Sequence, residues 1–506
     1  MARVTVGEST SGALYSPGPA SSTEDLELAE LGEEVPPKHT LLKLPGLLLL
    51  TSPSLGLQVC WFLLTSSGTP YLISLGISKS IISLVWVTGP ISGAFAQPIL
   101  GVLSDESQHA WGRRKPFIVG GSLCATIFLL ALAYSEELTA WTWSSSVGGS
   151  ASSAHLATQI LAVFSVVVTT FTLQAYAVGV RALIVDNSPP SQQTVAASWV
   201  MRWNVLGNVV LSSVGFMDAQ WSSTGANSNE RFKLLAVVVA ACTFTTVGLT
   251  CYLIADQNIT PSRDRQASFA QRSWAIISPT GLAKRWKQIP PRSRRVCEIQ
   301  FWAWAGWFPI LYYMSTFAYE TALSDKLEER QRQLMKPDPE LVESAKDFGF
   351  FASFAFALGA FAASILLQIL DRYMPAFSRN LPKVWFASQC FLGYCMHLTF
   401  VAHSGATAII VVAMMGSTAA VTMWAPFALI SAEISELSVG KQDSEVAWIL
   451  GLHNMAISLP QIGSTLVCAF LLAVLKVLGV ENSVAWIFRL ASIAVFWSAY
   501  LINKSQ

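Results

Sequence analysis

A short charged segment at residues 101–117 lies between two long apolar runs, at residues 81–100 and 117–134. It reads GVLSDESQHAWGRRKPF, with Asp105 near its start and three adjacent cations near its end. This pattern is typical of two membrane-spanning helices, because their connection must turn in water and its charges anchor both helix ends among the lipid headgroups. The segment therefore predicts an all-α membrane protein.

The rest of the chain repeats the alternation of apolar runs and short polar connections. Hydrophobic residues make up 52% of the 506 residues and charged residues 12%, whereas soluble proteins carry about 25% charged residues. A bilayer core takes about 20 apolar residues per helix. The sequence predicts twelve such helices, near residues 41–64, 80–103, 117–135, 156–186, 194–216, 233–255, 297–319, 348–370, 383–403, 407–430, 446–473 and 483–502.

The distribution of cations predicts the orientation and the division of the chain. Arginine and lysine gather in the connection after the second helix, in the connection after the eighth, and in a long basic stretch after the sixth. Because cytoplasmic loops are rich in these residues, both tails are predicted to be cytoplasmic. Two bundles of six helices around a central site are typical of transporters. The predicted parts are an acidic cytoplasmic tail (1–40), an N-terminal six-helix bundle (41–255), a basic cytoplasmic linker (256–296), a C-terminal six-helix bundle (297–502) and a short tail (503–506).

Two short segments suggest that the halves are related. RALIVD ends the fourth predicted helix at residues 181–186, and FALISAE ends the tenth at residues 427–433. The helices that follow contain Asn208 and Asn454, each with glycine or proline nearby. An internal repeat of six helices fits this placement, and Asn208 becomes a candidate for the central site.

Several functional classes are not supported by the sequence. It lacks the phosphate-binding motif GxxxxGK[ST], the zinc motif HExxH and the nucleophile motif GxSxG, so we expect no enzyme, cofactor or metal. The basic residues are dispersed among loops rather than gathered in one patch, so no nucleic-acid partner is expected.

Ionisable residues within apolar helices are functional candidates, because they are costly there unless they face a cavity or a partner. Arg181 is the strongest, since a guanidinium can hold two hydroxyl groups at once; the alternative is a side chain that extends to the headgroups. Asp186, Glu298 and Glu320 are candidates for carrying a proton, although the two glutamates would also fit exposed interfacial positions. His453 could titrate or could be a hydrogen-bonded packing residue.

Aromatic residues offer a second kind of candidate. Trp307 lies near the middle of the seventh predicted helix, and Trp424 lies in the tenth. An indole ring can stack on the apolar face of a sugar, and the alternative is the aromatic belt found at membrane interfaces. Trp307 lies too deep for that belt, so it is the better candidate for the stacking role.

Four segments of the chain carry a recognisable combination of residues. They are GPISG at residues 89–93 with the loop 101–117, RALIVD at 181–186, WAGWFP at 304–309 and WAPFALISAE at 424–433. In this combination the chain resembles the sucrose transporters in the glycoside-pentoside-hexuronide branch of the major facilitator superfamily, and the last two segments are most similar to the fungal members.

The resemblance implies proton-coupled uptake of sucrose or a related α-glucoside through alternating access, with a sugar and a proton as partners in the bilayer. It implies that Arg181 contacts the sugar or couples to the proton. It also implies that Asp105, Arg113 and Arg114 form a conformational latch. The plasma membrane is the expected location, with the vacuolar membrane as the alternative.

Thr170 is a departure from this family pattern. The plant members place an aspartate eleven residues before the arginine that matches Arg181, about three helical turns away, and that aspartate is the expected proton carrier. Threonine can hydrogen-bond a sugar but does not titrate in the physiological range. Either another carboxylate carries the proton, or the protein is an uncoupled facilitator; a transporter-like sugar sensor is the remaining alternative.

Overall fold

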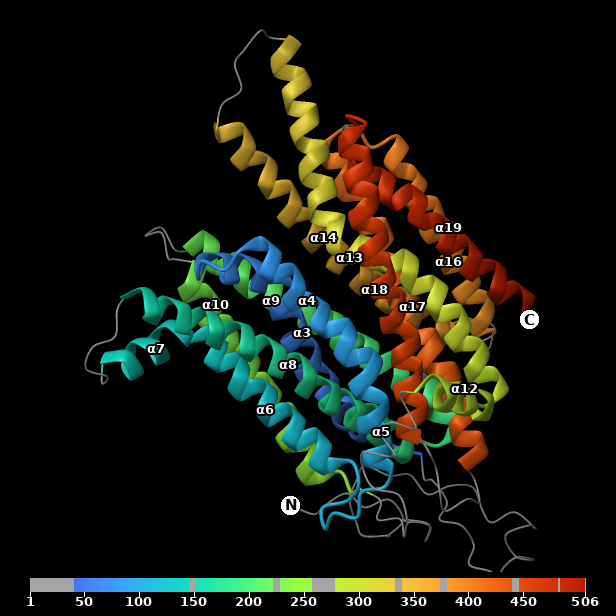
Figure 1. Cartoon of the computed structure of the whole chain (residues 1–506). Helices are drawn as coiled ribbons and strands as arrows, with labels where there is room; N and C mark the ends of the chain where they lie inside the picture. Colours follow the sequence, from blue (N-terminus) through green and yellow to red (C-terminus); the bar gives the residue numbers. More distant parts are fainter. Residues whose placement is uncertain are drawn as a thin grey trace, which may run out of the picture. The chain divides into compact units, whose positions relative to one another are not determined.

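The computed structural model describes residues 41–144, 151–221, 228–256, 278–332, 339–373, 380–438, 446–480 and 483–505. Regular secondary structure within these ranges is helical (Figure 1). The predicted acidic tail and residues 257–277 of the predicted basic linker lie outside them. The described residues divide into two compact units.

The first unit consists of the described residues of Met1–Pro290 and Ile430–Met455. The predicted linker contributes one amphipathic helix to it, α12 (Pro279–Gln288), which the side chain of Ser278 caps at its N-terminus. The other helices are α2 (Leu44–Thr51), α3 (Pro53–Ser74), α4 (Lys79–Ile91), η1 (Ser92–Ala96), α5 (Gln97–Asp105), α6 (Lys115–Ala133), α7 (Ser135–Ser144), α8 (Ala151–Asn187), η2 (Pro190–Gln192), α9 (Gln193–Trp221) and α10 (Ser228–Leu253).

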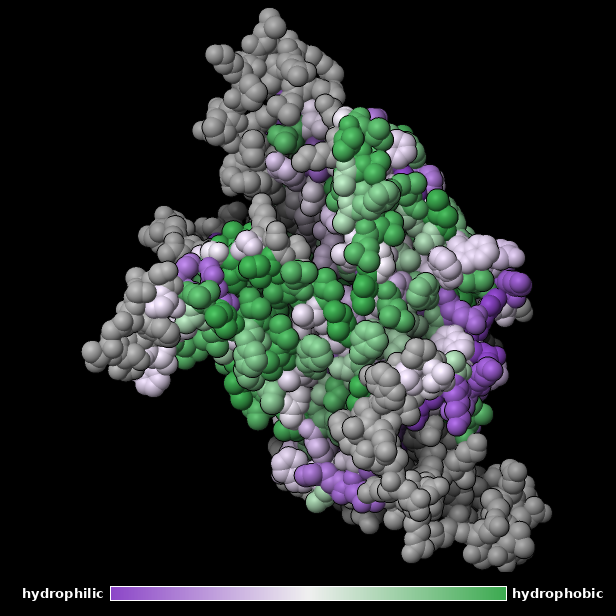
Figure 2. Space-filling view, in the orientation of Figure 1, coloured by the Kyte–Doolittle hydropathy of each residue, from purple (hydrophilic) through white to green (hydrophobic). Residues whose placement is uncertain are grey.

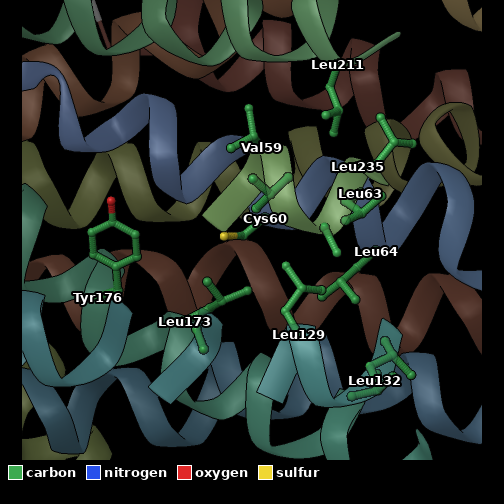
Figure 3. Packing of buried hydrophobic residues seen from close by; sticks show 14 of the residues in the cluster. Val59, Cys60, Leu63, Leu64, Leu129, Leu132, Leu173, Tyr176, Leu211 and Leu235 are labelled. Carbon is green, nitrogen blue, oxygen red and sulfur yellow. The ribbon is translucent and has the colours of Figure 1, made fainter. Parts of the chain in front are cut away.

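Leucine-rich faces of these helices meet in the interior of the first unit (Figure 3). Leu63 and Leu64 of α3 lie against Leu129 of α6, and Leu173 of α8 lies beside them; all four side chains are fully buried. Helices in a bilayer gain little from leaving lipid, so close packing of this kind provides much of their association energy. The packing holds α3, α6 and α8 as one body.

The second unit consists of the described residues of Pro291–Leu429 and Ala456–Gln506. Two of its helices are shared with the first unit, because α17 ends there and α18 begins there. The helices are α13 (Pro291–Arg332), α14 (Pro339–Tyr373), α16 (Leu381–His397), η3 (Leu398–Phe400), α17 (Gly405–Ser438), α18 (Val446–Val477) and α19 (Ser483–Lys504).

The second predicted membrane helix, at residues 80–103, is interrupted. It consists of α4, the π-helical turn η1 and α5, with Pro90 inside α4 and Pro98 in the first turn of α5. Proline lacks the amide hydrogen of a regular helix and crowds the carbonyl four residues earlier. A π-turn widens the helix locally, and such turns are frequent at functional sites.

All twelve predicted ranges contain helix, which agrees with the predicted all-α membrane fold. Among the described residues, seven helical segments are long and apolar enough to cross a membrane: Leu44–Thr69, Lys115–Ala133, Ser153–Asn187, Asn229–Leu253, Gly405–Leu437, Val446–Leu475 and Ser483–Lys504. The other five predicted spans correspond to α4 with α5, α9, α13, α14 and α16, which are interrupted, shorter or more polar.

Large apolar side chains point outward from both units (Figure 2). Leu84 of the first unit is 72% exposed, and Leu466 and Ile493 of the second are 70% and 67% exposed. Such a surface is unfavourable in water and suits hydrocarbon. The exterior therefore supports the prediction that the chain lies within a bilayer.

Candidate functional site

Arg114 lies at the centre of a buried charge cluster in the first unit. Its Nη2 lies 2.7 Å from Oδ1 of Asp105, and its Nε lies 2.8 Å from Oδ2 of Asp186. The Nη2 of Arg113 lies 3.0 Å from the same oxygen of Asp186. We call Asp105, Arg113, Arg114 and Asp186 the latch cluster. It joins the end of α5, the start of α6 and the end of α8.

Every charge in the latch cluster has an opposite charge within ion-pair distance. The Arg114 side chain is fully buried and also donates from Nη1 to the hydroxyl of Ser104 at 2.9 Å. Burial alone would lower the pKa of Arg114, but the negative charges of Asp186 and Asp105 outweigh it and raise that pKa. The guanidinium therefore stays charged, as a buried ion pair requires.

Asp105 also binds the first turn of α18. Its Oδ1 accepts from the backbone N–H of Ala447 at 3.2 Å, and its Oδ2 accepts from that of Trp448 at 3.0 Å. The first N–H groups of a helix lack partners within the helix and carry a partial positive charge, so a carboxylate is favourable there. Asp105 thus bridges Arg114 and the beginning of α18.

The backbones of α5 and α18 approach each other closely at two glycines. A Cβ atom on Gly101 would lie 2.6 Å from the carbonyl oxygen of Ala447, and one on Gly451 would lie 2.7 Å from Cα of Pro98. Only glycine permits this spacing. The contact between the helices therefore extends from the latch cluster towards the π-turn η1.

Asp256 fixes the other side of the loop before α6. Its Oδ2 accepts from the backbone N–H groups of Arg114 and Lys115, at 2.6 and 3.0 Å. Burial raises the pKa of Asp256, and the two N–H donors oppose that rise. Gly112 lies directly beside this carboxylate with φ of +106°, a conformation that L side chains rarely adopt.

Replacing Gly112 by alanine is expected to destabilise the folded protein by about 1–3 kcal/mol. The new Cβ atom would collide with the carboxylate of Asp256 and would also be strained at this φ. The measurement is the thermal unfolding midpoint of the purified protein in detergent. Gly120→Ala is the control, because a Cβ atom there has no heavy atom within 4 Å; equal midpoints for the two variants would contradict the account.

Arg181 lies half-buried in α8, where the sequence predicted an intramembrane cation. Its Nη1 lies 3.4 Å from Oδ1 of Asn454 in α18. The Nδ2 of Asn454 donates in turn to the carbonyl oxygen of Gly93 in η1 at 3.2 Å. Asn454 thus links the arginine to the interrupted helix, and the guanidinium is held by one neutral oxygen in this contact.

Thr170 lies three turns before Arg181 in α8, in a neutral polar cluster. Its buried hydroxyl lies 3.3 Å from that of Thr88 in α4 and donates to the carbonyl oxygen of Val167 at 2.8 Å. The hydroxyl of Ser92 donates to the carbonyl oxygen of Thr170 at 3.3 Å and accepts from Gln174 at 3.1 Å. The hydroxyl, amide and carbonyl groups that make these contacts do not titrate near pH 7.

Asn208 lies in α9, half-buried, and accepts a hydrogen bond from Nε2 of Gln58 in α3 at 3.0 Å. The contact joins two helices of the first unit. This hydrogen bond uses Oδ1 of Asn208, so the Nδ2 group can still donate to another acceptor.

Trp307 and Trp424 are both buried, unlike aromatic rings that present a face to a ligand. Trp307 is fully buried and donates from Nε1 to the hydroxyl of Thr422 at 3.2 Å, with Phe356 packed edge-on at 6.1 Å between ring centroids. Gln389 donates to the same hydroxyl at 3.2 Å. These contacts make Trp307 part of the hydrogen-bonded core of the second unit. Trp424 is 7% exposed.

The three predicted proton carriers lie in different environments. Asp186 belongs to the latch cluster, where two arginines neutralise it. Glu298 accepts from Arg295 at 2.8 Å, one turn earlier in α13. Glu320 is half-buried near the other end of the predicted span, and its Oε2 accepts from the backbone N–H of Val484 at 3.4 Å, in the first turn of α19. Within the second unit, Glu298 and Glu320 lie on distant turns of the same helix, α13, so they are not neighbours.

Two polar residues of the first unit stand out by their burial: His453, which the sequence raised as a candidate, and Gln97, which it did not. Gln97 is 0% exposed and His453 is 4% exposed. Neither has a hydrogen-bond partner for any side-chain polar atom within the described part of the chain. The sequence could have drawn attention to Gln97 as a glutamine in an otherwise apolar helix. It could not show that the side chain lacks a hydrogen-bond partner.

Comparisons with known proteins agree with this architecture. The sequence profile of the Major Facilitator Superfamily matches residues 54–465. The general alpha-glucoside permease of Schizosaccharomyces pombe is 26% identical, with 96% of each chain covered. A sucrose transport protein of Arabidopsis thaliana is 26% identical, with 84% of each chain covered. These similarities confirm the resemblance drawn from the four sequence segments.

Solved structures show the same fold. The fucose:proton symporter of E. coli superimposes with a TM-score of 0.56 at 14% identity, over 91% of this chain and 98% of the symporter. A proton:xylose symporter superimposes with a TM-score of 0.54 at 12% identity, over 90% of this chain and 95% of the symporter. With its profile match over most of its length and its helical fold, this chain belongs to the Major Facilitator Superfamily of integral membrane transporters.

Proposed function

We propose that this chain transports sucrose or a related α-glucoside across the plasma membrane by alternating access. The observation that carries the proposal is the placement of Arg181, a half-buried cation in an apolar helix, in a chain that matches an α-glucoside permease along nearly its whole length. A guanidinium in this position can donate to two hydroxyl groups of a sugar. Its contact with the neutral amide of Asn454 is one that a sugar hydroxyl can replace.

In this proposal the latch cluster controls one conformational state of the cycle. Its ion pairs join α5, α6 and α8, and Asp105 adds the first turn of α18. A transporter must release such contacts and form them again in each cycle, so their net free energy has to remain modest. Buried ion pairs suit this role because desolvation offsets much of their attraction. The proposed orientation places the latch cluster on the cytoplasmic side.

Glu320 is the proposed proton carrier. Asp186 lies against two arginines of the latch cluster and Glu298 lies against Arg295, so each of these carboxylates already has a cationic partner. Among the described residues, no cation lies within ion-pair distance of Glu320, whose contact is the N–H of Val484. A half-buried carboxylate without a cation can gain and release a proton more readily.

An uncoupled facilitator is the second candidate function. The observation in its favour is Thr170, which places a hydroxyl where the resemblance leads us to expect a carboxylate, in contact with Thr88 and Ser92. In this case the sugar moves only down its own gradient. The two candidates differ in whether a proton gradient drives accumulation.

Glu320→Gln is expected to abolish proton-driven accumulation of sucrose while leaving exchange of sugar across the membrane intact. Glutamine keeps the size and an acceptor oxygen but cannot take up a proton. The measurement is uptake of labelled sucrose into proteoliposomes, with and without an inward proton gradient, followed by exchange against unlabelled sugar. Glu298→Gln is the matched control and should retain accumulation, because Arg295 already neutralises that carboxylate.

Either of two results would contradict this assignment. Wild-type protein that equilibrates sucrose equally with and without the gradient would establish the facilitator. Proton-driven accumulation that survives in Glu320→Gln would show that another group carries the proton.

A further inference from the structure

Gln97 and His453 stand out in the first unit because each has two side-chain polar atoms and both atoms are buried without a partner among the described residues. These atoms are Oε1 and Nε2 of Gln97 and Nδ1 and Nε2 of His453, and none has a hydrogen-bond partner among the residues that the structure describes. An unpaired buried donor or acceptor destabilises a protein, and native proteins contain few. Four such atoms in two contacting helices offer donors and acceptors that a polar molecule could satisfy.

The two residues come from the part of α5 and α18 where the helices touch. A Cβ atom on Gly451, two residues before His453, would lie 3.0 Å from the carbonyl oxygen of Gln97. Asn454, the residue after His453, contacts both Arg181 and the carbonyl oxygen of Gly93. The unpaired atoms therefore lie in the neighbourhood of the arginine proposed to bind sugar.

We propose that Gln97 and His453 bind adjacent hydroxyl groups of the sugar that Arg181 engages, and so determine which sugars are accepted. This inference rests on the proposed function. A glutamine amide both donates and accepts, and a neutral imidazole donates from one nitrogen and accepts at the other. Neighbouring hydroxyl groups of a sugar also donate and accept, so they match this combination. An anion would require donors alone, which makes it a poorer match.

Buried water is the competing occupant, since a water molecule can also satisfy such groups. The two occupants differ in their consequence for substrate choice. A site built to hydrogen-bond a hydroxyl discriminates strongly against an analogue that lacks it. A site filled by structural water has no such preference.

The test compares His453→Leu and Gln97→Leu with the wild type in proteoliposomes, using sucrose and a panel of monodeoxy sucrose analogues. For at least one analogue, the wild-type half-saturation concentration should exceed that for sucrose by about tenfold or more. Each variant should raise the half-saturation concentration for sucrose by about tenfold. Each variant should also stop discriminating against the analogue that lacks the hydroxyl group bound by the replaced residue.

Gln389→Leu and His397→Leu are the matched controls from the second unit. Gln389 is buried but donates to Thr422 and accepts from Ser498 at 3.4 Å, and Nδ1 of His397 contacts the carbonyl oxygen of Gly393 at 2.9 Å. The controls should lower the unfolding midpoint and leave the half-saturation concentration unchanged. His453→Gln, which retains a donor and an acceptor, provides a milder variant that should shift the order of analogue preference at wild-type yield.

Unchanged half-saturation and unchanged analogue discrimination in folded His453→Gln and Gln97→Leu would overturn the inference in favour of buried water, while leaving the proposed function standing. A wild-type protein that transports neither sucrose nor another α-glucoside would instead overturn the proposed function, and this inference with it.

Discussion

Replacing Arg181 by alanine is expected to reduce sucrose transport by about a hundredfold. The substitution removes charge-assisted hydrogen bonds to sugar hydroxyls, which contribute about 1.5–3 kcal/mol each. It also removes a cation from an apolar helix, so insertion should not suffer. The measurement is labelled sucrose exchange in proteoliposomes, normalised to the amount of reconstituted protein. The effect should appear in transport and not in yield.

Two further variants distinguish recognition from structure at Arg181. Arg181→Lys keeps the charge but loses the planar fork, so it should recover only part of the activity. Arg489→Ala is the control for a structural arginine, because Arg489 donates to the carbonyl oxygen of Thr399 at 2.9 Å and lies over the ring of Phe400 at 3.8 Å. It should lower stability and leave substrate affinity unchanged. An Arg181→Ala protein with wild-type half-saturation and rate would remove Arg181 from the sugar site.

Arg114→Met is expected to destabilise the folded protein by about 3–5 kcal/mol, because it removes one partner from a buried ion-pair cluster. Methionine occupies a similar volume, so the main change is electrostatic. Asp105 would lose the guanidinium 2.7 Å away, whereas Asp186 would keep Arg113 at 3.0 Å. The measurement is the unfolding midpoint of the purified protein in detergent.

Arg295→Met is the matched control for Arg114→Met. Arg295 also lies 2.8 Å from a carboxylate, that of Glu298, but both side chains are about one-third exposed or more. A partly exposed pair contributes about 0–1 kcal/mol. The double variant Asp105→Asn/Arg114→Met should recover part of the stability lost in Arg114→Met, since it removes the unpaired carboxylate as well. Equal destabilisation by Arg114→Met and Arg295→Met would contradict the central position of Arg114.

Local sequence patterns predicted the helical membrane fold and the charged loop before α6. The apolar runs predict helices because a bilayer leaves few alternatives for the backbone. The resemblance implied that Asp105, Arg113 and Arg114 of this loop act together. The structure adds Asp186 to them. The sequence shows only that Asp186 lies at the end of a predicted helix. Which arginines it contacts depends on how α6 and α8 pack.

Other features depend on contacts between distant segments and had no local signal. Asp256 reaches the loop before α6 across more than 140 residues. Asn454 links α8 to η1, and its approach is possible because Gly451 lets α18 come close to α5. Trp307 was proposed as a stacking surface from its depth in the membrane. The hydroxyl of Thr422 and the ring of Phe356 instead enclose it in the second unit.

Exchange of labelled sucrose or maltose across proteoliposomes tests α-glucoside transport by this chain directly, because exchange requires translocation of the sugar and is independent of proton coupling. Vesicles containing the wild-type protein and loaded with unlabelled sugar should take up the label transiently to above its equilibrium level. Vesicles containing Arg181→Ala should remain near the level of empty vesicles. Wild-type vesicles that exchange neither sugar would contradict the assignment of this chain as an α-glucoside transporter.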